Sequence, residues 1–286
     1  MNKVVLPTLR NWLRGPYRKV RARYMRLRHG FGPAELLATL GQVEVRRGDA
    51  VLMHSTMRGF EGFSGSVSEV IAVLEEAIGP EGTLIMPTLS MSGSAVEFVQ
   101  ANKVFDVRTT PSQAGLLTEV FRRSPSVVRS LHPTHSVAVW GADTGWWIEN
   151  HHLADSPCGR GSPYHRLLER NGKILMAGVG IACLTFFHCA EELIESRMPE
   201  SPFTGERYVV KCKSGGHIIE TAPMRLYAPE LSRRRRLQPL EAELRDNRRW
   251  RDARIGTLNL IALNASDVLV TLEEMAGRGV FCYQTK

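Results

Sequence analysis

Residues 50–87 hold the pattern that most restricts the fold of this chain, a strand, a helix and a second strand in succession. The apolar run 50–54 predicts a buried strand, and the run 82–87 predicts another. Between them, residues 67–78 have a helical period and are followed by Gly79-Pro80, which ends a helix. Two strands joined in this way pair in parallel through a right-handed crossover. The unit therefore predicts an α/β fold containing a parallel pair of strands.

Residues 173–197 repeat the change from strand to helix and add chemistry to it. An apolar run at 174–177, bounded by glycines, predicts a third buried strand, and Thr185 is a plausible N-cap of the helix that follows. His188 would then lie in the first turn, where the positive end of the helix favours a neutral imidazole, as a general base requires. Glu191 falls three residues later on the same side. The other interpretation, a structural histidine on a half-buried helix, remains open.

Weaker patterns predict the remaining elements. Helices are expected at 33–41, 113–123, 164–170 and 265–276, with a strand fed by the loop 130–141 and a hairpin pairing 208–210 with 217–220. The arginine-rich stretch from 231 is expected to be helical. Glycine and serine at 63–67, before the helix 67–78, are compatible with phosphate binding, although these residues are also common caps.

Charge is concentrated at the edges of the sequence. The net charge is +8, yet residues 1–30 contain nine basic and no acidic residues, so the rest of the chain is close to neutral. Nucleic-acid binding is therefore not predicted. Residues 1–30 are interpreted as a basic N-terminal arm, which either contacts an anionic membrane surface or a partner, or is a solvated extension. Residues 31–286 are expected to form the catalytic domain.

Other features bear on location and cofactors. No apolar run reaches the ~20 residues of a membrane span, and the N-terminus lacks the apolar core of a secretory signal. Five cysteines without regular spacing suggest free thiols, so a cytoplasmic protein is predicted. The chain has no HExxH motif and no paired cysteines or histidines at ligand spacing, so no metal is predicted.

Six segments, in order, resemble the aminoglycoside 3-N-acetyltransferase family, also called the antibiotic N-acetyltransferases. They span roughly residues 34–197 and comprise 51–56, 79–88, 110–119, 129–138, 161–163 and 178–191. One departure is Leu184, where family members usually carry asparagine before the threonine. The resemblance implies mixed α/β sheets flanked by helices, in a topology of their own that differs from the GNAT fold.

The same resemblance implies acetyl transfer from acetyl-CoA to an amine. His188 matches the general base, and Glu191 matches a carboxylate lining the acceptor side. The loops His54-Ser55-Thr56 and His135-Ser136-Val137 match segments that border CoA, and Ser136 is a candidate oxyanion donor. The acid that orients the base lies downstream of the matching region, so Glu220 and Glu230 are both candidates and Glu220 is included in the predicted site.

Several alternatives stay open at this point. The acceptor is predicted to be an aminoglycoside, which would confer antibiotic resistance, or an amino sugar, including one linked to a nucleotide or glycan in surface polysaccharide synthesis. A cysteine–histidine mechanism through Cys158 is a rival, whereas Cys189 points about 100° away from His188 on their helix. A non-catalytic binding module is another. The expected partners are a small-molecule amine acceptor and, as open questions, a membrane and a second copy of the chain.

Overall fold

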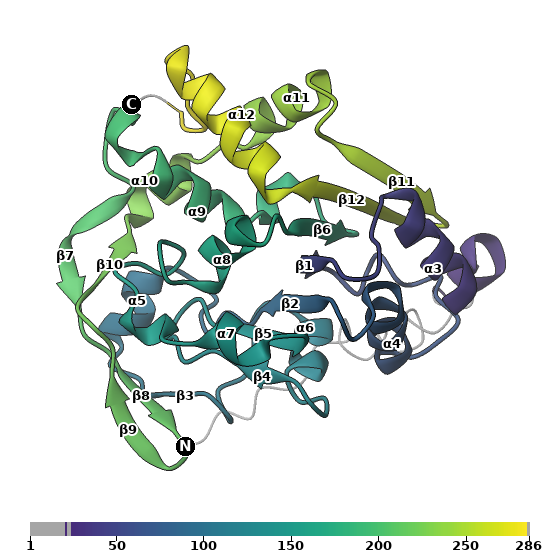
Figure 1. The fold of residues 1–286 in the computed structure, drawn as a ribbon, viewed down its shortest axis with the longest axis horizontal. Coiled ribbons are helices and arrows are strands. Elements are labelled where there is room, and N and C mark those ends of the chain that lie inside the picture. The colour runs from purple at the N-terminus through teal and green to yellow at the C-terminus, as the bar shows by residue number, and fades with distance from the viewer. Residues whose placement is uncertain (1–20, 22–23, 285–286) are drawn as a thin grey trace, which may run out of the picture.

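The structure is a computed structural model and describes residues 21 and 24–284. At its centre lies a seven-stranded mixed sheet with the strand order β11-β12-β6-β1-β2-β5-β4 (Figure 1). The strands are β1 (Ala50–Ser55), β2 (Thr83–Pro87), β4 (Val128–Arg129), β5 (Val137–Gly141), β6 (Lys173–Ala177), β11 (Arg251–Ile255) and β12 (Leu258–Asn264). The inner strands β6, β1 and β2 are parallel, and β12 and β5 flank them in antiparallel orientation.

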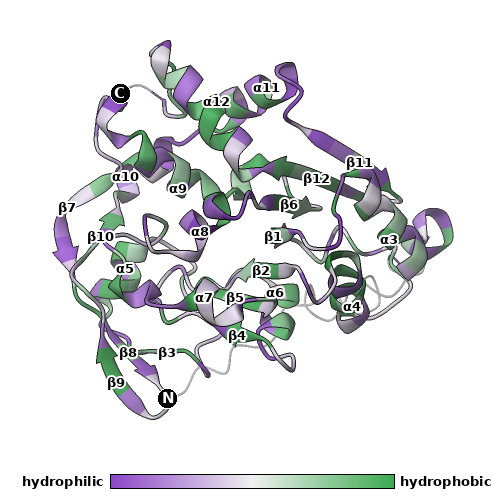
Figure 2. Cartoon of the chain, viewed as in Figure 1, coloured by the Kyte–Doolittle hydropathy of each residue, from purple (hydrophilic) through white to green (hydrophobic). Residues whose placement is uncertain are grey.

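Helices cover both faces of this sheet. One face packs against α3 (Pro33–Gln42), α4 (Val67–Ile78) and α6 (Leu116–Phe121). The other packs against α7 (Thr144–Ile148), α8 (Pro163–Glu169), α9 (Phe186–Leu193), α11 (Gln238–Asp246) and α12 (Ala265–Gly277). The mixed α/β class is therefore confirmed. Figure 2 shows hydrophilic residues gathered on elements such as β11, at the edge of the sheet.

The core consists of two layers because side chains alternate along each strand. On β6, Ile174 and Met176 enter one hydrophobic cluster, and Leu175 and Ala177 enter the other. Each of these four side chains is fully buried. An inner strand covered on both faces is expected to be a continuous apolar run, which is the pattern that revealed β6 in the sequence.

The predicted strand–helix–strand unit is confirmed, with β1 and β2 parallel and Val51 opposite Leu84. The helix α4 occupies the expected residues, and Ser66 caps it. The Ser66 hydroxyl accepts from the amide of Glu69 at 3.2 Å, and the Glu69 carboxylate accepts from the amide of Ser66 at 2.7 Å. This capping box satisfies the free amides of the first turn. Two of the amides at the helix start are thus occupied by the helix's own side chains, and phosphate binding at this place stays a prediction.

We expect Ser66→Ala to lower the free energy of unfolding by about 1 kcal/mol, because an N-cap hydroxyl is removed. Urea unfolding should show a lower midpoint with an unchanged slope. The exposed Ser64, two residues earlier, provides the matched control as Ser64→Ala. Equal midpoints for the two variants would contradict the capping role of Ser66.

Smaller elements lie beside one end of the main sheet. The strand β7 (Phe203–Tyr208) pairs with β10 (Met224–Tyr227), and β8 (Lys211–Ser214) pairs with both β3 (Phe105–Asp106) and β9 (His217–Glu220). The helices α5 (Ala95–Gln100) and α10 (Pro229–Arg234) lie on the same side of the molecule (Figure 1). A small apolar cluster joins α5 to β10 through Ala95, Met224 and Leu226.

Some local predictions were wrong. The hairpin forms around Gly215 and Gly216, both with positive φ, and pairs β8 with β9, whereas Val209 and Val210 are outside the strands. The helix expected at 113–123 begins only after Gly115, whose φ is 122°. The arginine-rich region is not one helix, because residues 251–255 form the edge strand β11. The short helix α3 continues through Gly41 to Gln42.

Most of the predicted basic arm lies outside the described residues, so its role and the boundary at residue 30 remain predictions. Within the described part, residues 24–29 are helical and Arg21 forms a 2.9 Å ion pair with Glu61. None of the helices that the structure describes is long and apolar enough to cross a membrane.

Candidate active site

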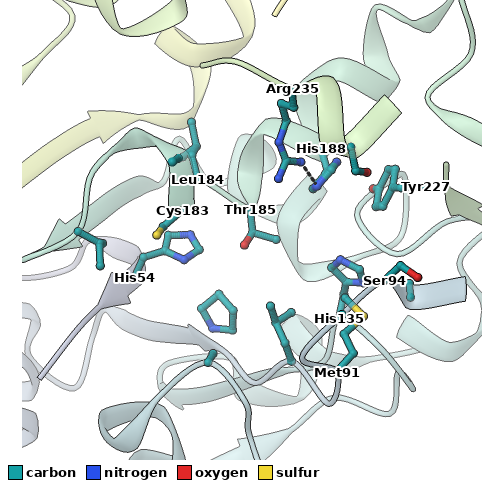
Figure 3. A pocket seen from close by; sticks show the side chains of 18 of the residues that line it. His54, Met91, Ser94, His135, Cys183, Leu184, Thr185, His188, Tyr227 and Arg235 are labelled. Atoms are coloured by element: carbon teal, nitrogen blue, oxygen red, sulfur yellow. Dashed lines mark hydrogen bonds between the residues drawn. The ribbon is translucent and has the colours of Figure 1, made fainter. Parts of the chain in front are cut away.

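A cavity of about 600 Å³ lies where the parallel strands β1 and β2 end. Its walls come from β1, the loop after β2, α5, the segment 179–188, β10 and α10. Carboxyl ends of neighbouring parallel strands are the usual place for a site in an open α/β sheet. The volume is within the range of small-molecule sites. Figure 3 shows His188, Tyr227 and Arg235 on one side of this cavity, with His54 across from them.

Sheet topology explains why distant segments meet here. His54 and Ser55 end β1, and both line the cavity. The antiparallel strand β5 starts beside the end of β2, with Val137 opposite Pro87, so the preceding His135 also reaches the cavity. After β6, Gly178 adopts a φ of 70° and turns the chain toward α9. A Cβ on Gly59 would lie 2.9 Å from the Gly178 Cα, so glycine allows the two loops to touch.

His188 lies in the first turn of α9, as predicted, and its ring lines the cavity. The Nδ1 atom is 2.5 Å from Oε1 of Glu191, three residues along the same helix. The ring of Tyr227 stacks on the imidazole, with 4.0 Å between ring centroids and 24° between planes. His188 is thus held by a carboxylate on one edge and an aromatic face on the other.

Glu191 is buried and is not among the residues that line the cavity, so the position expected for it on the acceptor side is wrong; both of its oxygens are engaged. Oε1 accepts from His188, and Oε2 accepts from the Tyr283 hydroxyl. Burial raises the pKa of Glu191, whereas the hydrogen bond from Tyr283 and the charge of Arg235 oppose that shift. The net result is a pKa raised to about 8, so Glu191 can exchange a proton near neutral pH while both of its oxygens stay hydrogen-bonded.

The third contact of the imidazole defines its tautomer. Nη1 of Arg235 lies 2.5 Å from Nε2 of His188 (Figure 3). A guanidinium has donors only, so Nε2 is the acceptor and the single proton of the neutral ring is on Nδ1, facing Glu191. Burial and then the charge of Arg235 lower the pKa of His188 well below its usual value. The predicted neutral imidazole is therefore the form that these contacts favour.

The other predicted loop residues differ in where they lie. Thr56 lines a second cavity of about 500 Å³, and Val179 lines both cavities. Ser136 and Val137 are fully buried beneath the first cavity rather than in its wall.

The oxyanion role expected for Ser136 is wrong in this structure. Its hydroxyl donates to the Thr88 carbonyl at 2.8 Å, and Nε of Arg129 donates to the same hydroxyl at 3.1 Å. The amide of Val137 donates to the Ser130 hydroxyl at 2.9 Å. The Ser136 hydroxyl and the Val137 amide are therefore both committed to contacts within the protein.

The carboxylates considered downstream of the helix do not reach the base. Glu220 is exposed on β9, where it pairs with Lys211 across the hairpin, and it is outside the cavity wall. Glu230 is exposed on α10 and forms a 3.1 Å ion pair with Arg233. The inclusion of Glu220 is corrected accordingly, since the carboxylate bonded to His188 is Glu191.

Three functional residues were missed in the sequence. Tyr227 and Arg235 contact His188 and lie 39 and 47 positions after it in the sequence. Tyr283 contacts Glu191 and lies 92 positions after it. Arg235 belongs to the noted arginine block, but nothing in the block distinguishes it from its neighbours. No local pattern identifies the two tyrosines.

Cys158, the nucleophile of the rival mechanism, was expected to be better exposed than Cys189, and this is wrong. Its side chain is fully buried, and burial together with Glu192 raises the pKa of its thiol well above the usual value. Cys189 is also fully buried, with its pKa raised by burial. Among residues 21 and 24–284, no group of three or more His, Cys, Asp or Glu side chains could hold a metal ion.

A neutral imidazole, oriented by a buried carboxylate and facing a small-molecule cavity, defines a site suited to taking a proton from a bound ligand. The family model for aminoglycoside 3-N-acetyltransferase matches residues 52–276. The chain belongs to the aminoglycoside 3-N-acetyltransferase family.

Individual relatives are more distant. Aminoglycoside N(3)-acetyltransferase III of Serratia marcescens is 28% identical over 170 residues, covering 55% of this chain and 63% of the relative. Aminoglycoside N(3)-acetyltransferase IV of Salmonella sp is 34% identical over 160 residues, covering 55% of this chain and 58% of the relative. These matches span less than two thirds of the relatives' length.

Solved structures resemble this chain over most of its length. The crystal structure of aminoglycoside acetyltransferase AAC(3)-Xa matches with a TM-score of 0.76 at 23% identity, covering 88% of this chain and 95% of that chain. The antibiotic N-acetyltransferase-like topology expected from the resemblance is therefore confirmed.

Proposed function

We propose that the chain is an acyltransferase that moves an acetyl group from acetyl-CoA to an amine of an aminoglycoside or amino sugar. His188 is the general base, and transfer is direct within a ternary complex. The observation that supports this most strongly is the Glu191–His188 pair in the cavity wall, with the proton on Nδ1 and the lone pair of Nε2 on the other edge of the ring.

The chemistry requires such a base. An amine is protonated at neutral pH and must lose a proton before its nitrogen can attack a thioester. Nε2 of His188 takes that proton, and the carboxylate of Glu191 stabilises the imidazolium that results. The nitrogen forms a bond to the acetyl carbon as the carbon–sulfur bond breaks, and the second proton of the nitrogen goes to the departing thiolate, so CoA leaves as the thiol and the product is an amide. No enzyme nucleophile is needed.

Acetyl-CoA is proposed to extend along the loop after β1. His54 and Ser55 line the first cavity and Thr56 lines the second, so one elongated substrate could contact all three. The residues fit a polar ligand: the Nε2 atom of His54 is buried without a protein partner, and burial lowers the pKa of this ring to about 4, which keeps it neutral. A solved structure of AAC-IIIb, which matches with a TM-score of 0.68, is a binary complex with CoASH.

The acceptor class is proposed from the relatives. AAC-VIa has been solved with sisomicin, and AAC(3)-IVa with a gentamicin and with apramycin. A screen of CoA thiol release over sisomicin, gentamicin and simple amino sugars tests the proposal directly. Release that depends on both the amine and acetyl-CoA is expected, and no release with any amine would contradict it.

A non-catalytic binding module makes a different prediction for the same protein. It need not bind acetyl-CoA, whereas the proposed enzyme does. Calorimetric titration of the full chain with acetyl-CoA separates the two, because absence of binding would favour the module. The arm, a second copy of the chain and a cytoplasmic location stay predictions.

We expect Cys158→Ser to retain acetyl transfer, because a buried thiol with a raised pKa is a poor nucleophile. Single-turnover kinetics should show no burst of acetyl-enzyme. Cys183, which is exposed and lines the cavity, is the matched variant as Cys183→Ser. Lost turnover in either variant, together with an acetylated wild-type cysteine in the mass spectrum, would revive the two-step mechanism.

A further inference from the structure

Arg235 brings a positive charge to the candidate base. Its neighbours Arg233 and Arg234 form ion pairs with Glu230 and Glu200. Within the described residues, Arg235 has no salt bridge to a carboxylate; its guanidinium donates to Nε2 of His188 and lies 5.8 Å from the ring centroid of Phe187. A guanidinium is satisfied best by an oxyanion, which it can bind through two parallel hydrogen bonds.

The backbone holds this arginine at the site. Arg235 forms an isolated antiparallel bridge with Tyr283, and the amide of the next residue donates to the Cys282 carbonyl at 2.7 Å. Tyr283 in turn donates to Glu191. The two bridged segments therefore supply the Tyr283 hydroxyl that donates to Glu191 and the Arg235 guanidinium that donates to His188. The backbone fixes the position of Arg235 beside the base.

The contact with Arg235 occupies the atom that the reaction needs. A neutral imidazole has one lone pair, and here the lone pair of Nε2 accepts from Arg235. An acceptor amine cannot give its proton to Nε2 while the guanidinium is there. Catalysis by His188 therefore requires that Arg235 first move from this nitrogen toward another acceptor.

The charged side chains of the cavity wall indicate which chemical group would accept the hydrogen bonds of Arg235 after it leaves His188. Among the described residues of the cavity wall, Arg233 and Arg235 are the basic side chains besides histidines, Glu97 is the one carboxylate, and Arg233 is already paired with Glu230. Arg235 is therefore the cation left to pair with a ligand, and its guanidinium attracts an oxyanion. We infer that the acceptor carries an oxyanion, a phosphate or carboxylate, which pairs with Arg235 and draws its guanidinium off Nε2 as the amine enters.

The claim that the oxyanion belongs to an amine substrate rests on the proposed acetyl transfer. The claim that Arg235 binds an oxyanion does not. Pairing Arg235 with an oxyanion has a second consequence, because the charge of Arg235 is one cause of the lowered pKa of His188. Neutralising that charge makes the ring more basic at the moment when the amine must lose its proton. Recognition of the acceptor and activation of the base thus occur through one side chain.

The binding part is tested without any turnover, by modifying His188 with diethyl pyrocarbonate and quantifying its peptide by mass spectrometry. Inorganic phosphate should accelerate modification of His188 in the wild type, compared with chloride at equal ionic strength. Arg235→Gln should accelerate it about tenfold without phosphate, the factor for losing a hydrogen bond of about 1.4 kcal/mol, and should remove the phosphate effect. The exposed His217 is the internal reference in the same digest.

The substrate part uses three amino sugars with the same 2-amine: glucosamine, glucosamine 6-phosphate and muramic acid. Wild-type kcat/KM for CoA thiol release should be about tenfold or more higher for at least one charged sugar than for glucosamine, as one charge-assisted hydrogen bond implies. The two charged sugars separate a phosphate from a carboxylate. Arg235→Gln should reduce the preference to near unity, and the exposed Arg248→Gln should leave it unchanged.

The outcomes separate this inference from the proposed function. The inference is overturned, and acetyl transfer stands, if sisomicin or glucosamine supports thiol release but an oxyanion on the sugar does not raise kcat/KM. It is also overturned if the rate of His188 modification changes neither with phosphate nor in Arg235→Gln. The absence of release with every amine, together with phosphate-dependent modification of His188, would overturn the acetyl transfer and leave the oxyanion site. Thermal melts of both arginine variants check that the fold is intact.

Discussion

Replacing His188 with asparagine is expected to lower kcat for amine acetylation by about 10²–10⁴-fold, the usual contribution of a general base. Asparagine is chosen because its amide nitrogen lies close to the position of Nδ1 and can still donate to Glu191, so the buried carboxylate keeps a partner. The nitrogen corresponding to Nε2 is removed. The measurement is steady-state CoA thiol release at saturating acetyl-CoA.

Binding of acetyl-CoA by the His188→Asn protein should persist in a calorimetric titration, because the predicted contacts to CoA come from the loop after β1. His217→Asn, on the exposed hairpin, is the control and should have wild-type kinetics. If the kcat of the His188 variant stays within a few fold of the wild-type value, His188 is not the general base. A melting temperature that drops sharply would instead indicate a folding defect, and the comparison would move to His188→Gln.

Glu191→Gln is expected to lower kcat by about 10²-fold or more. A neutral amide can still accept from Nδ1, but it cannot stabilise the imidazolium formed during proton transfer, and in a well-studied triad the equivalent amide costs about 10⁴-fold. The pH profile distinguishes this role from mere packing. Because the carboxylate favours the protonated ring, its loss should shift the acidic limb of kcat/KM to lower pH.

Tyr283→Phe is the matched test of the second oxygen of Glu191. It leaves Oε2 buried without the hydroxyl that donates to it, so a smaller loss of rate in the same direction is expected. Wild-type rates and an unshifted acidic limb in Glu191→Gln would show that this carboxylate serves the fold alone.

Local sequence patterns predicted the strands and helices in which apolar residues recur at a clear spacing. The parallel strands β1, β2 and β6 and the helices α4 and α12 were expected close to their observed positions, because buried strands and amphipathic helices differ in period. The strands β11 and β12 were not predicted. Pairing of β12 with β6 depends on contacts between segments more than eighty residues apart, which no local period describes.

The site shows the same division between local and distant information. The spacing of His188 and Glu191 predicted that both lie on one side of the helix, whereas the acid that orients the base was expected downstream, at Glu220 or Glu230. Ser136 illustrates the reverse error. A small polar residue in a loop near the site was a reasonable donor, but pairing of β2 with β5 places Thr88 against its hydroxyl. Only tertiary structure distinguishes a free donor from a committed one.

The bridge between Arg235 and Tyr283 also has a consequence for biosynthesis. The histidine and its carboxylate leave the ribosome about ninety residues before the tyrosine that completes their hydrogen bonding. A growing chain can therefore form much of the central sheet while its base is still incompletely oriented. The hydrogen bonding around His188 and Glu191 is therefore complete only after the segment that holds Tyr283 has been synthesised and has docked beside Arg235.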